Sequence, residues 1–220
     1  MSTGRSQAKG GTLQLNHVVA EALSIVNAGG LESLTMRRLA DSLDAHLPTI
    51  YRLVGDKHGL IDEMAETILS EALDRSRRGR GQSVDPAKRL AAGLRAALLS
   101  QRDGARIVGG NYGAKQANLT YVDTLVGCML DAGLGGERAL WAATAIFCFV
   151  LGEVLEEQGA TGGESVTLSN LVAAGHYPHL ASSPVTTMFD FDARFEFGLE
   201  LFLAGIRCGS AECSSPRTGE

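Results

Sequence analysis

The chain has 220 residues and a formal net charge of −5, and 45% of its residues are hydrophobic. This length suits one large domain or two small ones, and the composition fits a soluble globular protein with a sizeable core. Residues 1–60 carry six basic and five acidic side chains, so their net charge is +1 and that of the remainder is −6. Contact with a polyanion is therefore expected only in the N-terminal part.

Neither the N-terminus nor the cysteines indicate export. Residues 1–12 are polar and glycine-rich without the apolar stretch of a signal peptide, so we expect a flexible arm. The four cysteines show no zinc-like CxxC spacing. Cys128 and Cys148 fall in apolar helical segments, which predicts buried thiols in a reducing cytosol.

Three short helices are predicted before residue 56. Apolar residues recur at helical spacing from Leu15 to Val26, with Asn16 as a cap and Gly29-Gly30 as the end. Thr35 can cap a second helix, and Asp44 occupies the turn after it. The third helix has Pro48 in its first turn, where a missing N–H costs nothing. Its inward residues are predicted to be Ile50 and Val54, and its outward residues Thr49, Tyr51 and Leu53. Two short amphipathic helices joined by a tight turn are typical of a helix-turn-helix DNA reader.

The rest of the chain is predicted to be helical, and no segment indicates a strand. One helix follows from about 57 to 74, and the basic run 75–83 is the best domain boundary, either as a solvated loop or as a second phosphate contact. Asp85 caps a helix that begins with Pro86. Further helices are expected at about 118–132, 137–158 and 191–207, with a short one at 166–174. The middle of segment 137–158, residues 139–152, is apolar all round, but it is short for a membrane span and charged residues close it on both sides, which predicts burial against its own core and a partner subunit.

The N-terminal residues resemble the DNA-binding domain of the tetracycline repressor (TetR) family. That family has a pattern close to T-x-R-x-L-A-x-x-L-G-V-x-x-P-T-L-Y-x-H-V-x-x-K. The similarity continues into the segments 98–107, 149–158 and 195–206, so it covers nearly the whole chain. The positions that match the pattern, or stand at its variable points, are Thr35, Arg37, Leu39, Ala40, Leu43, Asp44, Ala45, Pro48, Thr49, Ile50, Tyr51, Leu53, Val54 and Lys57.

The resemblance implies a set of DNA-contacting residues. Arg37 would reach a guanine edge, Pro48 a thymine methyl, and Thr49, Tyr51 and Lys57 phosphates. Tyr51 can also be a packing residue, and Arg37 a plain surface arginine. The tetracycline repressors have a glutamine where Leu47 stands and a histidine where Leu53 stands. Because leucine cannot hydrogen-bond a base edge, the resemblance implies a different operator.

The resemblance also implies a ligand pocket, but one of altered chemistry. The tetracycline repressors hold a magnesium–drug chelate with polar side chains and a histidine, whereas Val108 stands at the position of that histidine. Glu156 matches a glutamate near the magnesium, but a carboxylate alone is a weak magnesium site. We therefore expect a bulky, hydrophobic and polyketide-like ligand that binds without a metal. The alternative is that the leucines at these pocket positions simply fill the core. The expected ligand-binding residues are Leu73, Leu90, Leu94, Val108, Asn111, Tyr112, Leu125, Phe147 and Glu156.

The remaining signals are weak. His176 and His179 lack a third ligand, so they predict no metal site. Glu156 and Glu157 are neighbours on a helix and point in different directions, which argues against acid–base catalysis. No nucleophile elbow or phosphate-binding glycine loop is present in the sequence. We therefore expect no metal, no cofactor and no enzymatic activity.

These inferences combine into an all-α, ligand-responsive repressor that acts as a homodimer on a pseudo-palindromic double-stranded operator. The protein is expected in the bacterial cytoplasm, associated with the nucleoid, and not in a membrane. Two alternatives stay open: a ligand-blind dimeric DNA-binding regulator, and a helical enzyme or small-molecule carrier. The expected parts are a flexible arm at 1–12, a three-helix DNA-binding domain at 13–58, a larger helical ligand-binding and dimerisation domain at 59–210, and a flexible tail at 211–220.

Overall fold

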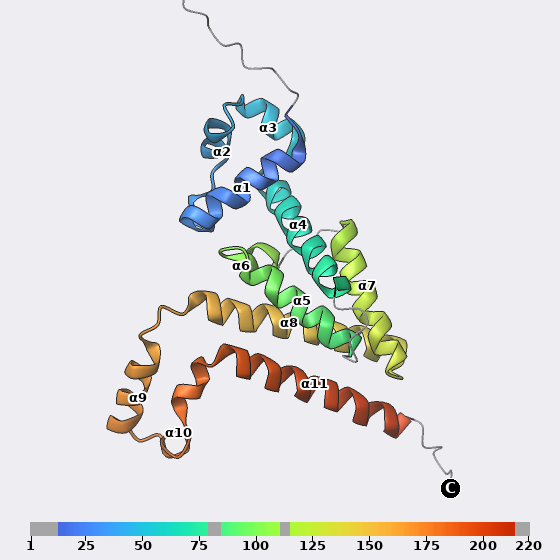
Figure 1. Cartoon of the computed structure of the whole chain (residues 1–220), viewed down its shortest axis with the longest axis vertical. Coiled ribbons are helices and arrows are strands. Elements are labelled where there is room, and N and C mark those ends of the chain that lie inside the picture. The colour runs from blue at the N-terminus through green and yellow to red at the C-terminus, as the bar shows by residue number, and fades with distance from the viewer. Residues whose placement is uncertain (1–12, 79–84, 111–114, 214–220) are drawn as a thin grey trace, which may run out of the picture. The chain divides into compact units, whose positions relative to one another are not determined.

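The computed structural model describes residues 13–78, 85–110 and 115–213, with side chains described as far as residue 208. Within these residues every regular element is a helix, as the all-α prediction required (Figure 1). The chain forms two compact units, residues 1–64 and residues 65–220. The predicted arm at 1–12 and most of the predicted tail lie outside the described residues.

The first unit, which we call the head, contains four short elements and the start of a longer helix. Its core is made by apolar side chains from each α-helix, among them the fully buried Val18, Leu39 and Ile50. Fully burying such a side chain contributes about 1.5–3 kcal/mol, which is how helices this short stay folded. The elements are α1 (Leu15–Gly29), η1 (Leu31–Ser33), α2 (Met36–Ser42), α3 (Leu47–Val54) and the first residues of α4 (Lys57–Arg78).

Local sequence signals set most of the head's helix ends. The Thr35 hydroxyl accepts the backbone N–H of Arg38 at 3.1 Å, which confirms the predicted cap of α2. Asp44 adopts φ +47°, the left-handed conformation predicted for the turn. The predicted Asn16 cap is wrong, because α1 begins at Leu15 and the Asn16 side chain accepts the N–H of its neighbour His17 instead.

The second unit, which we call the body, is a set of packed helices. Helices α5, α6, α7 and α8 contact one another, and α11 packs along α8 (Figure 1). Asp85 caps α5 by accepting the N–H of Ala87 at 2.8 Å, as predicted. Besides the rest of α4, the body's elements are α5 (Pro86–Leu99), α6 (Gly104–Val108), α7 (Gln116–Asp131), α8 (Gly136–Gly159), α9 (Glu164–Ala174), α10 (Pro178–Ala181), η2 (Val185–Phe189) and α11 (Phe191–Cys213).

Several predicted boundaries in the body are wrong. Helix α4 continues to Arg78 rather than ending near residue 74, so the first residues of the basic run are helical and not a loop. Arg75 and Arg77 pair there with Glu71 and Asp74, one turn earlier on the same helix. Residues 79–84 of that run lie outside the described residues. Helix α11 extends to Cys213 instead of residue 207. The short helices α6 and α10 were not predicted at all.

Helix α8 has one buried and one exposed apolar side. Ala143, Ile146 and Val150 face the core, whereas Trp141 is 62% exposed. Cys148 is exposed on the outer side, so its prediction as a buried thiol is wrong. With 24 residues, α8 is long and apolar enough to cross a membrane by length and composition alone, because it extends beyond the apolar middle 139–152 that was predicted to be too short. An exposed apolar side of this kind is typical of a surface that contacts another protein.

Candidate DNA-reading head and effector-binding body

In the head, α3 turns an apolar side inward and a mixed side outward. Ile50 and Val54 are buried, as predicted. Tyr51 is 41% exposed, but Thr49 and Leu53 are half-buried. The most outward positions are instead Pro48 and Arg52, so the predicted outer set missed an arginine.

Three basic side chains of the head are exposed and have no partner among the described residues. They are Arg37 in the first turn of α2, Arg52 on α3, and Lys57 at the start of α4. The sequence singled out Arg37 and Lys57 but not Arg52. Exposed cations that are free of intramolecular ion pairs are available for an anionic partner. The predicted reading residues Leu47 and Pro48 stand at the start of α3, half-buried and exposed respectively.

In the body, five of the predicted ligand-binding residues are buried in the helical core. They come from four elements: α4, α5, α6 and α7. Phe147 on α8 is half-buried. Asn111 and Tyr112 lie outside the described residues. The exposed fraction is 6% or less for each of Leu73, Leu90, Leu94, Val108 and Leu125.

Tyr121, which was not predicted, is buried beside two of these residues, Leu90 and Phe147. Its side chain is fully buried, and its hydroxyl donates to the backbone carbonyl of Leu90 at 3.0 Å. Its ring centroid lies 5.8 Å from that of Phe147. Burial raises the pKa of the Tyr121 hydroxyl, so the group stays neutral. Its spacing of four residues from Ala117 and Leu125 was the available signal, since all three share one face of α7.

Glu156 does not join the other candidates. It is exposed near the end of α8 and lines a separate cavity of about 740 Å³. The walls of that cavity come from α8, α9, η2 and the start of α11, including Leu168, Phe189 and Arg194. The sequence could not separate Glu156 from the rest, because the prediction relied on a family position and not on a helix face.

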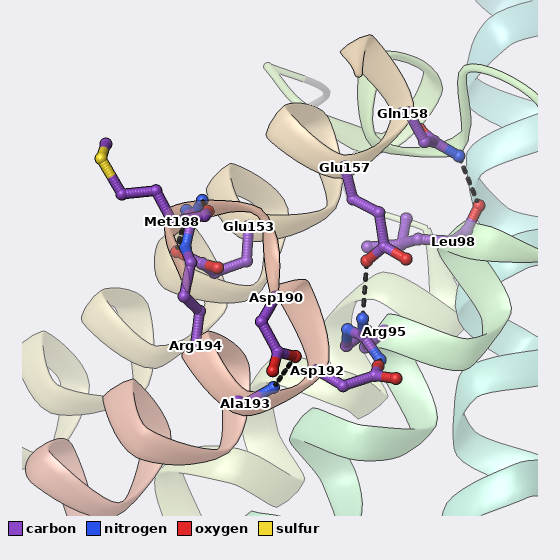
Figure 2. Close-up of polar contacts among 10 residues, drawn as sticks. All are labelled: Arg95, Leu98, Glu153, Glu157, Gln158, Met188, Asp190, Asp192, Ala193 and Arg194. Atoms are coloured by element: carbon purple, nitrogen blue, oxygen red, sulfur yellow. Dashed lines mark hydrogen bonds and ion pairs between the residues drawn. The ribbon is translucent and has the colours of Figure 1, made fainter. Parts of the chain in front are cut away.

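A polar network next to Glu156 fixes the end of α8 to three other elements (Figure 2). Arg95 on α5 pairs with Glu157 at 2.6 Å and with Asp192 at 2.7 Å. The Gln158 amide donates to the carbonyl of Leu98 at 3.1 Å and to that of Gln101 at 2.8 Å. Its carbonyl oxygen accepts the N–H of Ala105 in α6 at 3.2 Å. One side chain therefore ties the end of α5 to the start of α6, the short helix that carries Val108.

Comparisons with known proteins agree with this arrangement. Residues 77–209 match the family model described as "Tetracyclin repressor-like, C-terminal domain". The tetracycline repressor protein class G of Vibrio anguillarum is 33% identical over 193 residues, which cover 86% of this chain and 91% of that protein. The chain belongs to the tetracycline repressor family. It is accordingly a ligand-responsive, DNA-binding transcriptional repressor and not an enzyme.

Solved structures of TetR-family proteins have the same fold. A "possible TetR family transcriptional regulator" from Streptomyces coelicolor A3(2) is 40% identical, with a TM-score of 0.78 over 89% of this chain and 99% of that one. ActR from Streptomyces coelicolor in complex with actinorhodin is 28% identical, with a TM-score of 0.78 over 90% and 98% of the two chains. BioQ with its double-stranded DNA operator is 25% identical, with a TM-score of 0.66 over 89% and 99%.

Proposed function

We propose that this TetR-family repressor reads a pseudo-palindromic operator as a homodimer and is released from it by a hydrophobic, metal-free small molecule. The observation that carries the DNA-reading part is the exposed side of α2 and α3, where Arg37 and Arg52 have no intramolecular partner. Leu47, Pro48, Thr49, Tyr51 and Lys57 complete the proposed contact set. The operator complex of the similar protein BioQ supports the same use of this fold.

Dimerisation is supported by the exposed apolar sides of α8 and α11. Trp141 is 62% exposed, Phe197 68% and Leu201 59%. A cavity of about 640 Å³ between the two helices is lined almost entirely by apolar side chains, with Arg138 at its edge. Exposed apolar surface of this extent is typical of a protein–protein interface. A twofold dimer would present two α3 helices to two half-sites.

The proposed effector is bulky and apolar because the body's core contains almost no polar group. Among the described residues the buried side chains are apolar apart from the hydroxyl of Tyr121, which is bonded to the Leu90 carbonyl. Val108 has no lone pair for a metal, and Glu156 lines a different cavity. A polyketide-like natural product fits this lining, and the actinorhodin complex of ActR is in keeping with it. Room for such a ligand requires side chains of this core to move.

Release from DNA requires that the effector bind the DNA-incompetent arrangement more tightly than the DNA-bound one. Helix α4 is the element suited to carry the change, since it begins at Lys57 in the head and ends at Arg78 in the body. The controlled gene would encode an exporter, a resistance function or a biosynthetic step. As a DNA-binding regulator of this family the protein is cytoplasmic, and we propose that it associates with the nucleoid.

A thermal-shift series tests the effector class. Actinorhodin and related aromatic polyketides should raise the melting temperature without magnesium, because binding only the native state stabilises it. Tetracycline with magnesium should leave the temperature unchanged. Strong stabilisation by the magnesium–tetracycline chelate that disappears with EDTA would contradict the metal-free pocket. The same compounds are then added to the complex of the protein with operator DNA. If none of them releases the DNA, the ligand-blind alternative is favoured.

A further inference from the structure

The outward side of α3 has a centre, and Arg52 occupies it. Successive helical residues are rotated by about 100°, so a residue two positions after Ile50 and two before Val54 points away from both. Pro48 lies one turn earlier on the same side. Pro48 and Arg52 are both exposed, whereas Ile50 and Val54 are buried. Arg52 is therefore the long side chain that projects furthest from the head's core along this helix.

Arg52 is also the α3 residue best equipped to identify a base pair. Leu47 and Leu53 have no hydrogen-bonding group, and Thr49 and Tyr51 each have one hydroxyl. The guanidinium group of arginine carries five N–H donors in a planar fork, which matches O6 and N7 of guanine in the major groove. Base-reading residues of a groove helix lie on one face at offsets of three, four and seven positions. Arg52 lies four positions after Pro48 and three after Thr49, so it has two of these offsets.

The guanidinium of Arg52 is not engaged elsewhere. It has no hydrogen bond or ion pair among the described residues. Two arginines of the body are held instead: Arg95 pairs with Glu157 at 2.6 Å, and Arg194 pairs with Glu153 at 3.0 Å. No intramolecular ion pair has to break before Arg52 contacts DNA.

We propose that Arg52 reads a guanine in the major groove of each operator half-site, at a base pair different from the one that Arg37 reads. The inference rests on the proposed function and adds a specificity-determining residue to it. Arg37 projects from α2 and Arg52 from the outer face of α3, so the two address separate positions. The operator should then contain two symmetry-related guanines whose recognition depends on Arg52.

The test begins with operators that the full-length wild-type protein selects from a random duplex library. Each position of the selected half-site is then varied, and binding is measured for the wild type, Arg52→Ala, Arg52→Lys and Arg37→Ala. We expect Arg52→Ala to lose affinity about tenfold or more, and to lose the guanine preference at one symmetric pair of positions. Arg52→Lys should keep most of the salt dependence but lose that preference, because its ammonium lacks the fork. Arg37→Ala should affect a different position.

Arg78→Ala is the matched control, since it removes an exposed and partner-free arginine from the body end of α4. Its base preferences should equal those of the wild type. Uniform weakening of Arg52→Ala on every duplex, with all preferences intact, would make Arg52 a phosphate contact and overturn the proposal. Unchanged binding would overturn it as well. Failure of the wild type to select any sequence would instead refute the proposed function, and Arg52 would have no preference to set.

Discussion

Glu66 is a single side chain that organises the junction of two helices in the body. It lies on α4, and its two carboxylate oxygens accept the backbone N–H groups of Ala117 at 2.5 Å and Asn118 at 3.2 Å. These donors belong to the first turn of α7, which has no side-chain cap of its own. A carboxylate at a helix start satisfies unpaired N–H groups and also interacts favourably with the helix dipole.

Replacing Glu66 by glutamine should lower the free energy of unfolding by about 1–2 kcal/mol, because charge-assisted hydrogen bonds to backbone donors are lost. Urea denaturation of the two proteins measures the difference. Asp123→Asn is the control, since Asp123 is an exposed acid on α7, the helix whose first turn Glu66 contacts. Its replacement should change the free energy of unfolding by less than about 0.5 kcal/mol. Equal stability of the two variants would show that the Glu66 contacts contribute nothing.

At the scale of the element, the start of α9 depends on one acid. Glu164 accepts the N–H of Thr161 at 2.6 Å and the N–H of Gly162 at 2.8 Å. The hydrogen bond from the Thr161 hydroxyl, and then those from the backbone, hold the pKa of Glu164 down from its usual 4.5 to about 2. A depressed folded-state pKa means that the carboxylate form supports this turn.

The stabilisation of the α9 turn should therefore be fully present above pH 4.5 and be lost as the pH falls through about 2. NMR titration of the Glu164 carboxyl and of the Thr161 and Gly162 amides follows this directly. Thr161→Val removes the largest cause, so its midpoint should move up toward the usual value. A wild-type midpoint near 4.5 would contradict a role of the Glu164 carboxylate in holding this turn.

Sequence periodicity was sufficient for the long helices, and it failed where tertiary contacts decide. Helices α1, α4, α5, α7, α8 and α11 were predicted because each repeats apolar residues over several turns. Helix α6 has only five residues, and its Ala105 amide donates to the Gln158 side chain of α8. No local sequence pattern therefore predicts this helix. Arg52 was predictable, because the inward positions Ile50 and Val54 place the residue midway between them on the opposite side of the helix.

The candidate body site was predictable in composition but not in arrangement. The leucines at family positions indicated an apolar interior, and Leu90, Leu94 and Leu125 are indeed buried. The position of Tyr121 was not predictable in this way. Its hydroxyl reaches the Leu90 carbonyl only because α5 packs against α7. That Glu156 would face another cavity depends on where α8 turns toward α9.

At the scale of the whole molecule, reading DNA and pairing subunits fall to different parts of the chain. The head supplies the exposed, partner-free cations Arg37, Arg52 and Lys57, and α8 and α11 of the body supply exposed apolar faces. Because a single short helix contacts only one half-site, the account requires two heads bound at once. Operator affinity should therefore depend on Phe197 in the body as well as on Arg37 in the head.

Fluorescence anisotropy of labelled operator DNA tests this central claim most directly, with a scrambled duplex as control and several salt concentrations. The wild type should bind the operator tightly, with a steep loss of affinity as salt rises. Arg37→Ala and Phe197→Glu should each weaken binding at least tenfold. The matched variant Leu119→Glu, which changes an apolar residue of α7 that is 57% exposed, should not. Equal binding of operator and scrambled duplex by the wild type would contradict the account.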